Sequence, residues 1–300
     1  MQKEKVGFIG IGTMGWPMAV NLIRAGYEVV VFDSDPAKAR RFASDQGGTA
    51  AESLKQLAAS VTIVVTMLPD GSIVNDAALK QEDGAILRAL GRGGLLIDMS
   101  SSDPIGTRRL GTALKEHGIA LVDAPVSGLA PRAIEGTLTI MIGGDDPAAI
   151  ERAKPILSAM GSRLFETGPL GSGHAMKALN NYVASASFAT VSEALIIGER
   201  FGLDPAAMVE VMNASSGRSF NTEIIVKNQV LTRTFASGFA LGLIAKDAKT
   251  AADLADALGL NAPMAQLTSA RWQEAVQAIG GGRDHTAVFP FWKAQATGEG

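Results

Sequence analysis

The order of short apolar runs and helical patterns most constrains the fold of the first half of the chain. We expect strands at residues 5–10, 28–33, 61–68, 95–99, 120–124 and 138–142, and another near 163–166. Helical patterns fall between them, as at residues 14–25, 53–59, 105–117 and 147–160. Continuously apolar runs such as VTIVV are typical of strands buried on both faces, in parallel sheets covered by helices. The order therefore predicts a doubly wound parallel α/β sheet.

The loop after the first expected strand contains regularly spaced glycines. It reads VGFIGIGTMG, in which Gly10, Gly12 and Gly15 form the pattern G-x-G-x-x-G. The first glycine permits a tight turn, the second lets the backbone approach a pyrophosphate, and the third lets helix and strand pack closely. The N-terminus of the following helix supplies N–H donors for the phosphates. We therefore expect a Rossmann-type domain that binds a dinucleotide through Gly10, Ile11, Gly12, Thr13, Met14 and Gly15.

Asp33 ends the second expected strand, about twenty residues after the glycines, where dinucleotide-binding domains carry an acidic residue. A carboxylate there accepts hydrogen bonds from the adenosine ribose hydroxyls and repels a 2′-phosphate. The next residues, Ser34 and Asp35, supply no arginine to hold that phosphate. We therefore expect NAD to be preferred over NADP.

The second half of the chain is helical in pattern. Residues 174–201 contain no proline and only Gly198 as glycine, which would give a helix of about 40 Å. Asp204 and Pro205 form a helix start, and further helical patterns cover residues 239–258 and 263–280. We expect an NAD-binding Rossmann domain at residues 1–168 and an all-α domain for substrate and oligomerisation at residues 169–300, joined by the long helix. That helix is rich in Ala, Ile and Leu, which indicates a subunit interface.

Composition excludes several classes of protein. The net charge is −3, and the absence of a long basic block argues against nucleic-acid binding. No apolar run is long enough to span a membrane, and the first residues leave no room for a signal peptide. The chain has no cysteine, and its 3 histidines are too scattered to predict a metal site. We expect a soluble, cytoplasmic protein without a metal.

Lys177 lies in the stretch GSGHAMKALNN, near the start of the long helix. Oxidation of an alcohol by a nicotinamide needs a base for the hydroxyl proton, and this chain offers few other candidates. Free lysine has a pKa of about 10.4, so desolvation, the cationic NAD ring and the helix N-terminus would have to favour the neutral amine. Asn181 lies four residues on, on the same helix face. Taken alone, Lys177 fits either a catalytic base or a solvated lysine.

Two further stretches bear on this choice. The first, DAPVSGLAPRAIEGTLTIMIGG, begins where a strand ends, and its backbone N–H groups near Ser127 and Gly128 would hold a substrate carboxylate or belong to an ordinary surface loop. The second, FALGLIAKD, ends in Lys246 and Asp247, which form either a surface ion pair or part of a cleft wall.

Together these motifs make the chain resemble the β-hydroxyacid dehydrogenase family, which includes 3-hydroxyisobutyrate dehydrogenase and tartronate semialdehyde reductase. The match runs in order through GFIGIGTMGWPMAVNL, DAPVSG with GTLTIMIGG, G-x-G-x-x-x-K-x-x-N-N and F-x-L-x-L-x-x-K-D, over nearly the whole chain. The resemblance implies a Rossmann domain with an α-helical domain, assembled as a homodimer or homotetramer. Its site residues, by position, are Lys177 as acid/base, Asn181 orienting the substrate or the lysine, Ser127 and Gly128 on the substrate carboxylate, and Leu68, Pro69, Ser101, Lys246 and Asp247 at the cofactor.

The sequence also departs from the family. Leu129 follows Ser127 and Gly128 where members commonly read S-G-G, and Arg132 stands where a glycine usually precedes the alanine. Leu129 either narrows the substrate pocket or redirects a backbone donor. Arg132 either pairs with a second anionic group on the substrate or points into water. The two residues put a direct copy of 3-hydroxyisobutyrate specificity in doubt.

These observations predict an NAD-dependent enzyme that interconverts a short, anionic 3-hydroxy acid and its semialdehyde or keto form, with Lys177 as general acid/base. Alternatives within the class are reduction of tartronate or another small semialdehyde, and oxidation of a polyhydroxy acid such as threonate. A 6-phosphogluconate dehydrogenase usually has a larger helical domain, and imine reductases commonly lack the lysine. A non-catalytic dinucleotide-binding scaffold is the alternative from another class. The substrate, the physiological direction and the choice of dimer or tetramer stay open.

Overall fold

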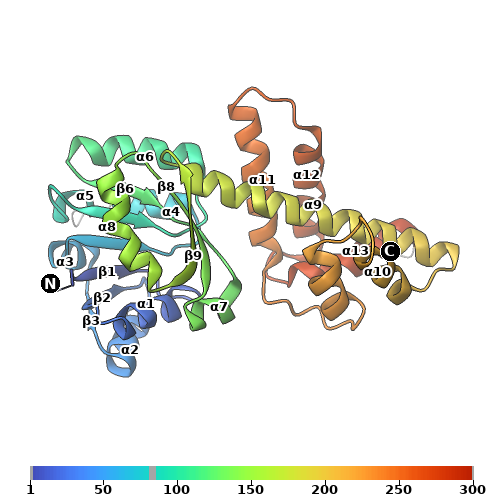
Figure 1. The fold of residues 1–300 in the computed structure, drawn as a ribbon, viewed down its shortest axis with the longest axis horizontal. Helices are drawn as coiled ribbons and strands as arrows, with labels where there is room; N and C mark the ends of the chain where they lie inside the picture. The colour runs from blue at the N-terminus through green and yellow to red at the C-terminus, as the bar shows by residue number, and fades with distance from the viewer. Residues whose placement is uncertain (1–2, 81–85, 299–300) are drawn as a thin grey trace. The chain divides into compact units, whose positions relative to one another are not determined.

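The computed structural model describes residues 3–80 and 86–298 and divides into two compact units, Met1–Lys177 and Ala178–Gly300. The first unit is a sheet with helices, coloured blue to green in Figure 1, and the second is helical. This confirms the expected fold class, an α/β domain followed by an all-α domain. No helix among the described residues combines the length and apolar character needed to cross a membrane.

The described strands of the first unit form one sheet in the order β3-β2-β1-β4-β5-β6-β8-β7, with β9 paired to β8. All pairs among the first six strands, β1 through β6, are parallel. Strand β8 runs antiparallel to β6 and β7, and β9 runs parallel to β8. The expected strands are present with ends shifted by a few residues, whereas the sequence patterns do not predict β3 or β7. The strands are β1 (Val6–Ile9), β2 (Val29–Phe32), β3 (Thr49–Ala50), β4 (Ile63–Thr66), β5 (Leu95–Asp98), β6 (Ala120–Asp123), β7 (Val126–Ser127), β8 (Leu138–Gly144) and β9 (Gly161–Gly168).

Both faces of the central strands of this sheet are buried, which explains why those strands are continuously apolar over most of their length. Alternate residues of a strand point to opposite faces. In β4, Ile63 and Val65 belong to one core cluster, and Val64 belongs to the other. In β5, Leu95 and Ile97 face the first cluster and Leu96 the second. The first three residues of each strand are therefore apolar, as expected of a sheet covered on both sides, and a buried polar residue, Thr66 or Asp98, ends the strand.

Several helices of the first unit begin at an aspartate followed by a proline. Asp35 and Asp103 each accept hydrogen bonds from two backbone N–H groups of the first turn, Asp146 accepts one, and the proline needs no partner there. The sequence patterns above do not include α2, α4, η1, α5 or α7. The helical segments are α1 (Gly15–Arg24), α2 (Pro36–Gln46), α3 (Leu54–Ala59), α4 (Gly71–Asn75), η1 (Asp76–Lys80), α5 (Ile86–Ala89), α6 (Pro104–Glu116), α7 (Leu129–Glu135) and α8 (Pro147–Ser158).

The long expected helix is α9 (Ser172–Phe201), which starts in the first unit and continues into the second. The second unit has an aromatic core in which Phe188, Trp272 and Trp292 are in ring contact. The sequence patterns do not predict η2 or α13. The segments after α9 are α10 (Pro205–Asn213), η2 (Asn221–Val230), α11 (Leu241–Ala257), α12 (Pro263–Ile279), η3 (His285–Ala287) and α13 (Val288–Thr297).

Candidate active site

The glycines of the loop after β1 have different surroundings. Gly10 has a φ of +90°, and a Cβ there would lie less than 3.0 Å from the carbonyl oxygen of Met67. A Cβ on Gly15 would collide with the carbonyl oxygen of Gly10, so α1 could not approach β1. A Cβ on Gly12 would meet no protein atom within 4 Å. The open side of Gly12 fits the close approach of a pyrophosphate, and the other two glycines shape the turn.

Asp33 connects this loop to the end of β2. Its buried carboxylate accepts the Ile11 N–H at 3.0 Å through one oxygen and the Asp35 N–H at 3.0 Å through the other. The ammonium of Lys38 in α2 lies 3.4 Å from the second oxygen. The sequence alone does not place Lys38 near Asp33, because that contact depends on where α2 begins. The carboxylate that the sequence predicts to face an adenosine ribose therefore has a cation beside it.

The turns after β4 and β5 are tied together by a buried carboxylate. Asp98 Oδ1 accepts the Thr66 hydroxyl at 2.9 Å and the Ser100 N–H at 3.0 Å. Ser100 Oγ in turn accepts the Leu68 N–H at 2.9 Å. Leu68 and Pro69 follow β4, and Ser101 follows β5, so these expected cofactor residues lie at the same edge of the sheet as the glycine-rich loop. Ligands bind at this carboxyl edge in doubly wound sheets.

The Ser127 region has an unusual backbone. Ser127 pairs with Thr139 between β7 and β8, and Gly128 follows with a φ of +142°. Leu129 has a φ of 59°, in the left-handed region that costs a residue with a side chain about 1–2 kcal/mol. This conformation explains why a glycine suits the position, and the described structure accommodates leucine there with its side chain partly exposed.

Arg132 covers the backbone of Gly128. A Cβ on Gly128 would lie less than 3.0 Å from Cβ and Cδ of Arg132, so the aliphatic part of the arginine rests against the glycine. The arginine is exposed, and its guanidinium forms no hydrogen bond or ion pair with any residue that the structure describes. A cationic group is thus available next to the expected carboxylate-binding residues.

The start of α9 is fixed to the sheet by Asp123, at the end of β6. Its buried carboxylate accepts the Gly171 N–H at 2.7 Å and the His174 N–H at 2.8 Å. A Cβ on Gly173 would lie less than 3.0 Å from this carboxylate and from the Met141 carbonyl oxygen. The glycines before Lys177 therefore allow α9 to cross closely over β8. Lys177 follows in the second turn of α9 and is half-buried.

His174 lies in a buried polar setting that its place in the sequence does not predict. Its side chain is buried, and its Nδ1 lies 2.8 Å from the Thr107 hydroxyl oxygen. Its Nε2 is 3.6 Å from Asp98 and its Nδ1 is 3.8 Å from Asp123. The partners come from β5, β6 and α6, so only the folded chain brings them together. Among the described residues no group of acidic and histidine side chains is arranged to hold a metal ion.

The remaining expected site residues lie in the second unit. Asn181 is buried, and its Nδ2 donates a hydrogen bond of 2.6 Å to Asp247 Oδ2. The ammonium of Lys246 lies 3.6 Å from Asp247 Oδ1. Asp247 is itself buried, so the Lys246–Asp247 pair is more than a surface ion pair, and it is the Asp247 carboxylate that holds the Asn181 amide nitrogen.

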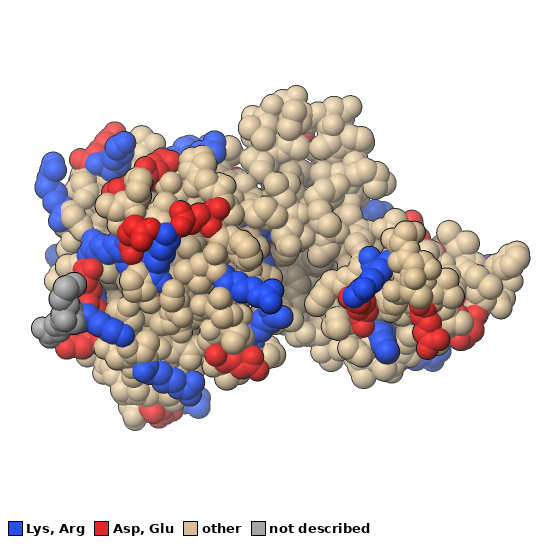
Figure 2. Space-filling model, in the orientation of Figure 1, with Lys and Arg blue, Asp and Glu red and all other residues tan. Residues whose placement is uncertain are grey.

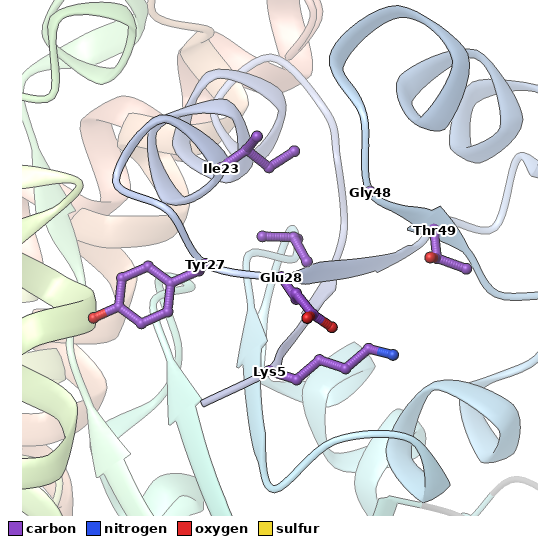
Figure 3. A pocket seen from close by; sticks show the side chains of 7 residues that line it. Lys5, Ile23, Tyr27, Glu28, Gly48 and Thr49 are labelled. Atoms are coloured by element: carbon purple, nitrogen blue, oxygen red, sulfur yellow. The ribbon is translucent and has the colours of Figure 1, made fainter. Parts of the chain in front are cut away.

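A hollow elsewhere on the first unit lies at the opposite edge of the sheet. Figure 3 shows its lining, which includes Lys5 before β1, Glu28 before β2 and Thr49 at the start of β3. These residues lie at the amino ends of the strands, whereas the glycine-rich loop follows a carboxyl end. The hollow is therefore separate from the candidate active site.

Family models match both parts of the chain. A model described as the NAD binding domain of 6-phosphogluconate dehydrogenase matches residues 5–168. A model described as NAD-binding of NADP-dependent 3-hydroxyisobutyrate dehydrogenase matches residues 171–292.

Individual relatives agree with these matches. The chain is 37% identical over 300 residues to 2-(hydroxymethyl)glutarate dehydrogenase of Eubacterium barkeri, covering 99% of this chain and 98% of that one. It is 37% identical over 269 residues to 3-hydroxyisobutyrate dehydrogenase of Pseudomonas aeruginosa, covering 87% and 89%. A solved structure of Mycobacterium tuberculosis 3-hydroxyisobutyrate dehydrogenase with L-serine is 29% identical, with a TM-score of 0.88 and coverage of 96% and 99%. The chain therefore belongs to the β-hydroxyacid dehydrogenase family of NAD(P)-dependent oxidoreductases.

Proposed function

We propose that this enzyme interconverts a short 3-hydroxy acid and its semialdehyde or keto form, using Lys177 as the acid/base group. The observation that carries the proposal is the attachment of α9. Asp123 binds the first turn of α9 to the carboxyl edge of the sheet, where the glycine-rich loop also lies. Lys177 therefore extends from a helix that begins at the edge where a dinucleotide is bound in this fold.

The substrate class rests on chemistry shared by the named relatives. 3-Hydroxyisobutyrate, L-serine and 2-(hydroxymethyl)glutarate each carry a hydroxyl on the carbon β to a carboxylate. Ser127 and the Gly128 N–H would bind that carboxylate. Arg132 would bind a second anionic group, such as the distal carboxylate of a glutarate. Semialdehydes such as tartronate semialdehyde and polyhydroxy acids such as threonate are the alternatives that a substrate panel must include.

The reaction divides between cofactor and protein. A bound nicotinamide supplies the hydride acceptor or donor. During oxidation the neutral Lys177 amine takes the hydroxyl proton as hydride leaves the same carbon, and during reduction it returns that proton to the oxygen. Asn181, held by Asp247, would orient the substrate or the lysine amine. Leu68, Pro69, Ser101 and Lys246 would contact the cofactor.

We propose NAD as the preferred cofactor. The Asp33 carboxylate would accept hydrogen bonds from the ribose hydroxyls and repel the 2′-phosphate of NADP. Lys38 reduces this repulsion, because its ammonium lies 3.4 Å from the carboxylate. The ratio of kcat/KM for the two cofactors tests the preference directly. A higher kcat/KM with NADP would reject it.

We also propose a homodimer or homotetramer formed through the second unit. Several large apolar side chains there are exposed, including Val183, Ile197 and Phe201 on α9. Figure 2 shows few charged side chains on the visible face of the α11–α12 hairpin. The exposed residues of this hairpin include Leu258, Leu260, Met264 and Leu267. Exposed apolar surface of this kind marks subunit contacts. Analytical ultracentrifugation measures the assembly, and a monomer would reject the proposal.

We also propose that residues 1–168 bind the cofactor and that residues 169–300 bind the substrate and form the assembly. Binding of NADH to a fragment of residues 1–168 tests this division. We further propose a cytoplasmic location, which cell fractionation tests.

The deciding experiment is the Lys177→Ala variant. We expect kcat to fall by about a thousandfold, within the range for removal of an acid/base group, while NADH binds as in the wild type. The control is Lys115→Ala, which removes an exposed lysine of α6 and should leave kcat unchanged. Turnover is measured from the absorbance of NADH. The substrates tested are glycerate, threonate, serine, 3-hydroxypropionate, 3-hydroxyisobutyrate and 2-(hydroxymethyl)glutarate. Unchanged turnover in Lys177→Ala would remove lysine from the mechanism, and NADH binding without turnover of any substrate would favour a scaffold.

A further inference from the structure

The buried surroundings of His174 join four elements at the start of the helix that carries Lys177. The imidazole lies between Asp98 at the end of β5 and Asp123 at the end of β6, at 3.6 Å and 3.8 Å respectively. On its third side it contacts Thr107 of α6 at 2.8 Å. Its own backbone N–H is bound by Asp123 at 2.8 Å. His174 is therefore held by both its backbone and its ring.

The hydrogen bonds around the ring define its orientation. The Thr107 hydroxyl lies 3.0 Å from the Asp103 carbonyl oxygen and donates to it, so its oxygen is free to accept from Nδ1–H of His174. Asp98 is held in turn by Thr66, Ser100 and Ser102. Nε2 points toward Asp98 and lies slightly beyond hydrogen-bond distance, so it has no hydrogen-bond partner among the described residues. A buried ring nitrogen without a hydrogen bond lowers the stability of the fold, so the ring is expected to serve a purpose other than stability.

That purpose follows from helix geometry. Residues three apart on a helix lie on neighbouring parts of one face, so His174 and Lys177 move together. A shift of about 1 Å in a catalytic group costs on the order of a hundredfold in rate. We propose that His174, together with Thr107 and Asp123, is a positioning residue that sets the location of the Lys177 amine. The proposal rests on the proposed role of Lys177 and adds a group that does not touch the substrate.

Substitutions at His174 and Thr107 test the ring contacts separately. His174→Ala removes the ring, and we expect kcat to fall about a hundredfold with an unchanged Kd for NADH. His174→Asn keeps a donor near the position of Nδ1, so it should retain more activity than the alanine variant. Thr107→Val has nearly the same shape and removes only the hydroxyl, and it should lower kcat about tenfold. The valine variant keeps the test valid if His174→Ala fails to fold.

The matched control is His285→Ala in the second unit. His285 is also buried and lies 3.0 Å from a hydroxyl, that of Ser237. Its removal should lower Tm as much as His174→Ala does, yet leave kcat within about twofold of the wild type at temperatures well below Tm. If kcat falls by the same factor in both variants, the effect of removing His174 is general destabilisation and the proposal fails.

A double variant shows whether His174 acts through the lysine. Groups that work as a unit have strongly non-additive effects on kcat. If Lys177→Ala has already removed the amine, adding His174→Ala should cause no further loss of kcat. A further large loss would show an independent role and overturn the proposal, as would full activity of His174→Ala. Those results leave the proposed function intact, whereas unchanged turnover in Lys177→Ala alone rejects the proposed function itself.

Discussion

Alanine at Gly12 tests whether the loop after β1 holds a pyrophosphate. A Cβ at this position meets no protein atom within 4 Å, and the backbone is not in the left-handed region, so the protein should fold with its stability unchanged within about 0.5 kcal/mol. The methyl group would nevertheless occupy the space that a phosphate must enter. Loss of a hydrogen bond to a charged group costs about 1.5–3 kcal/mol, which weakens NADH binding roughly ten- to hundredfold.

Alanine at Gly15 should have the opposite effect. Its Cβ would collide with the carbonyl oxygen of Gly10, a backbone atom that cannot move without shifting β1. Overpacking of this kind costs about 1–3 kcal/mol, against a gain of about 0.5–1 kcal/mol for alanine over glycine in a helix. Because the collision is with a backbone atom, the cost lies near the upper end of that range, and we expect a net loss of about 2–2.5 kcal/mol and a Tm lowered by roughly 4–10 °C.

Two measurements on the same samples separate these outcomes. Thermal unfolding followed by circular dichroism reports stability, and titration of NADH fluorescence reports binding at a temperature where both variants are folded. Gly12→Ala should bind poorly at an unchanged Tm, and Gly15→Ala should show a lowered Tm. If Gly12→Ala binds NADH as tightly as the wild type, the loop does not contact the phosphates and the assignment of the cofactor site is refuted.

The remaining predictions concern the substrate pocket and the second unit. Arg132→Met keeps the aliphatic stem and removes the charge, so KM for 2-(hydroxymethyl)glutarate should rise about tenfold or more while KM for 3-hydroxyisobutyrate stays constant; equal changes would contradict the proposed pairing. Asp247→Ala leaves the buried Asn181 carboxamide without its 2.6 Å partner, which should cost about 1–3 kcal/mol of unfolding free energy and lower kcat, and full activity would count against an orienting role for Asn181. Burial lowers the pKa of His285 from 6.5, against the opposing effect of Asp284. The unfolded chain then binds a proton that the folded chain resists, so this contribution to stability is present above about pH 6.5 and is lost as the pH falls below it. Unfolding curves between about pH 8 and pH 5 should therefore depend less on pH in His285→Gln, and an unchanged dependence would refute this origin.

The fold class could be predicted from local patterns, because most strands and most of the longer helices carry their own pattern of apolar residues. Buried strands such as β4 and β5 are apolar except at their last residue, and the glycine-rich loop follows a known pattern for a strand, a tight turn and a helix that bind a phosphate. Asp33 could be assigned to the end of β2 because it directly follows an apolar run that predicts a strand. Short elements are harder to predict. The pair Asp35 and Pro36 carried a helix-start signal for α2, but the polar helix that follows has little apolar periodicity.

Contacts between distant segments could not be predicted. Asp98 and Asp123 are distant in sequence from His174 and become its neighbours only because parallel strands end at one edge of the sheet. The left-handed backbone of Leu129 leaves no trace in residue type, since leucine is not a residue that favours it. Lys38 reaches Asp33 because α2 begins directly after β2, which the sequence patterns did not resolve.

Asp33 also limits how readily this enzyme can change its cofactor. One of its oxygens accepts a hydrogen bond from the Ile11 N–H, so the residue that would select against the 2′-phosphate also fixes the loop that we propose binds the diphosphate. Replacing Asp33 with alanine to admit NADP would therefore loosen that loop and weaken the binding of both cofactors. Asparagine keeps an acceptor for Ile11, discards the negative charge and releases Lys38 from its ion pair, so redesign, or natural drift between cofactors, is expected to begin with that exchange.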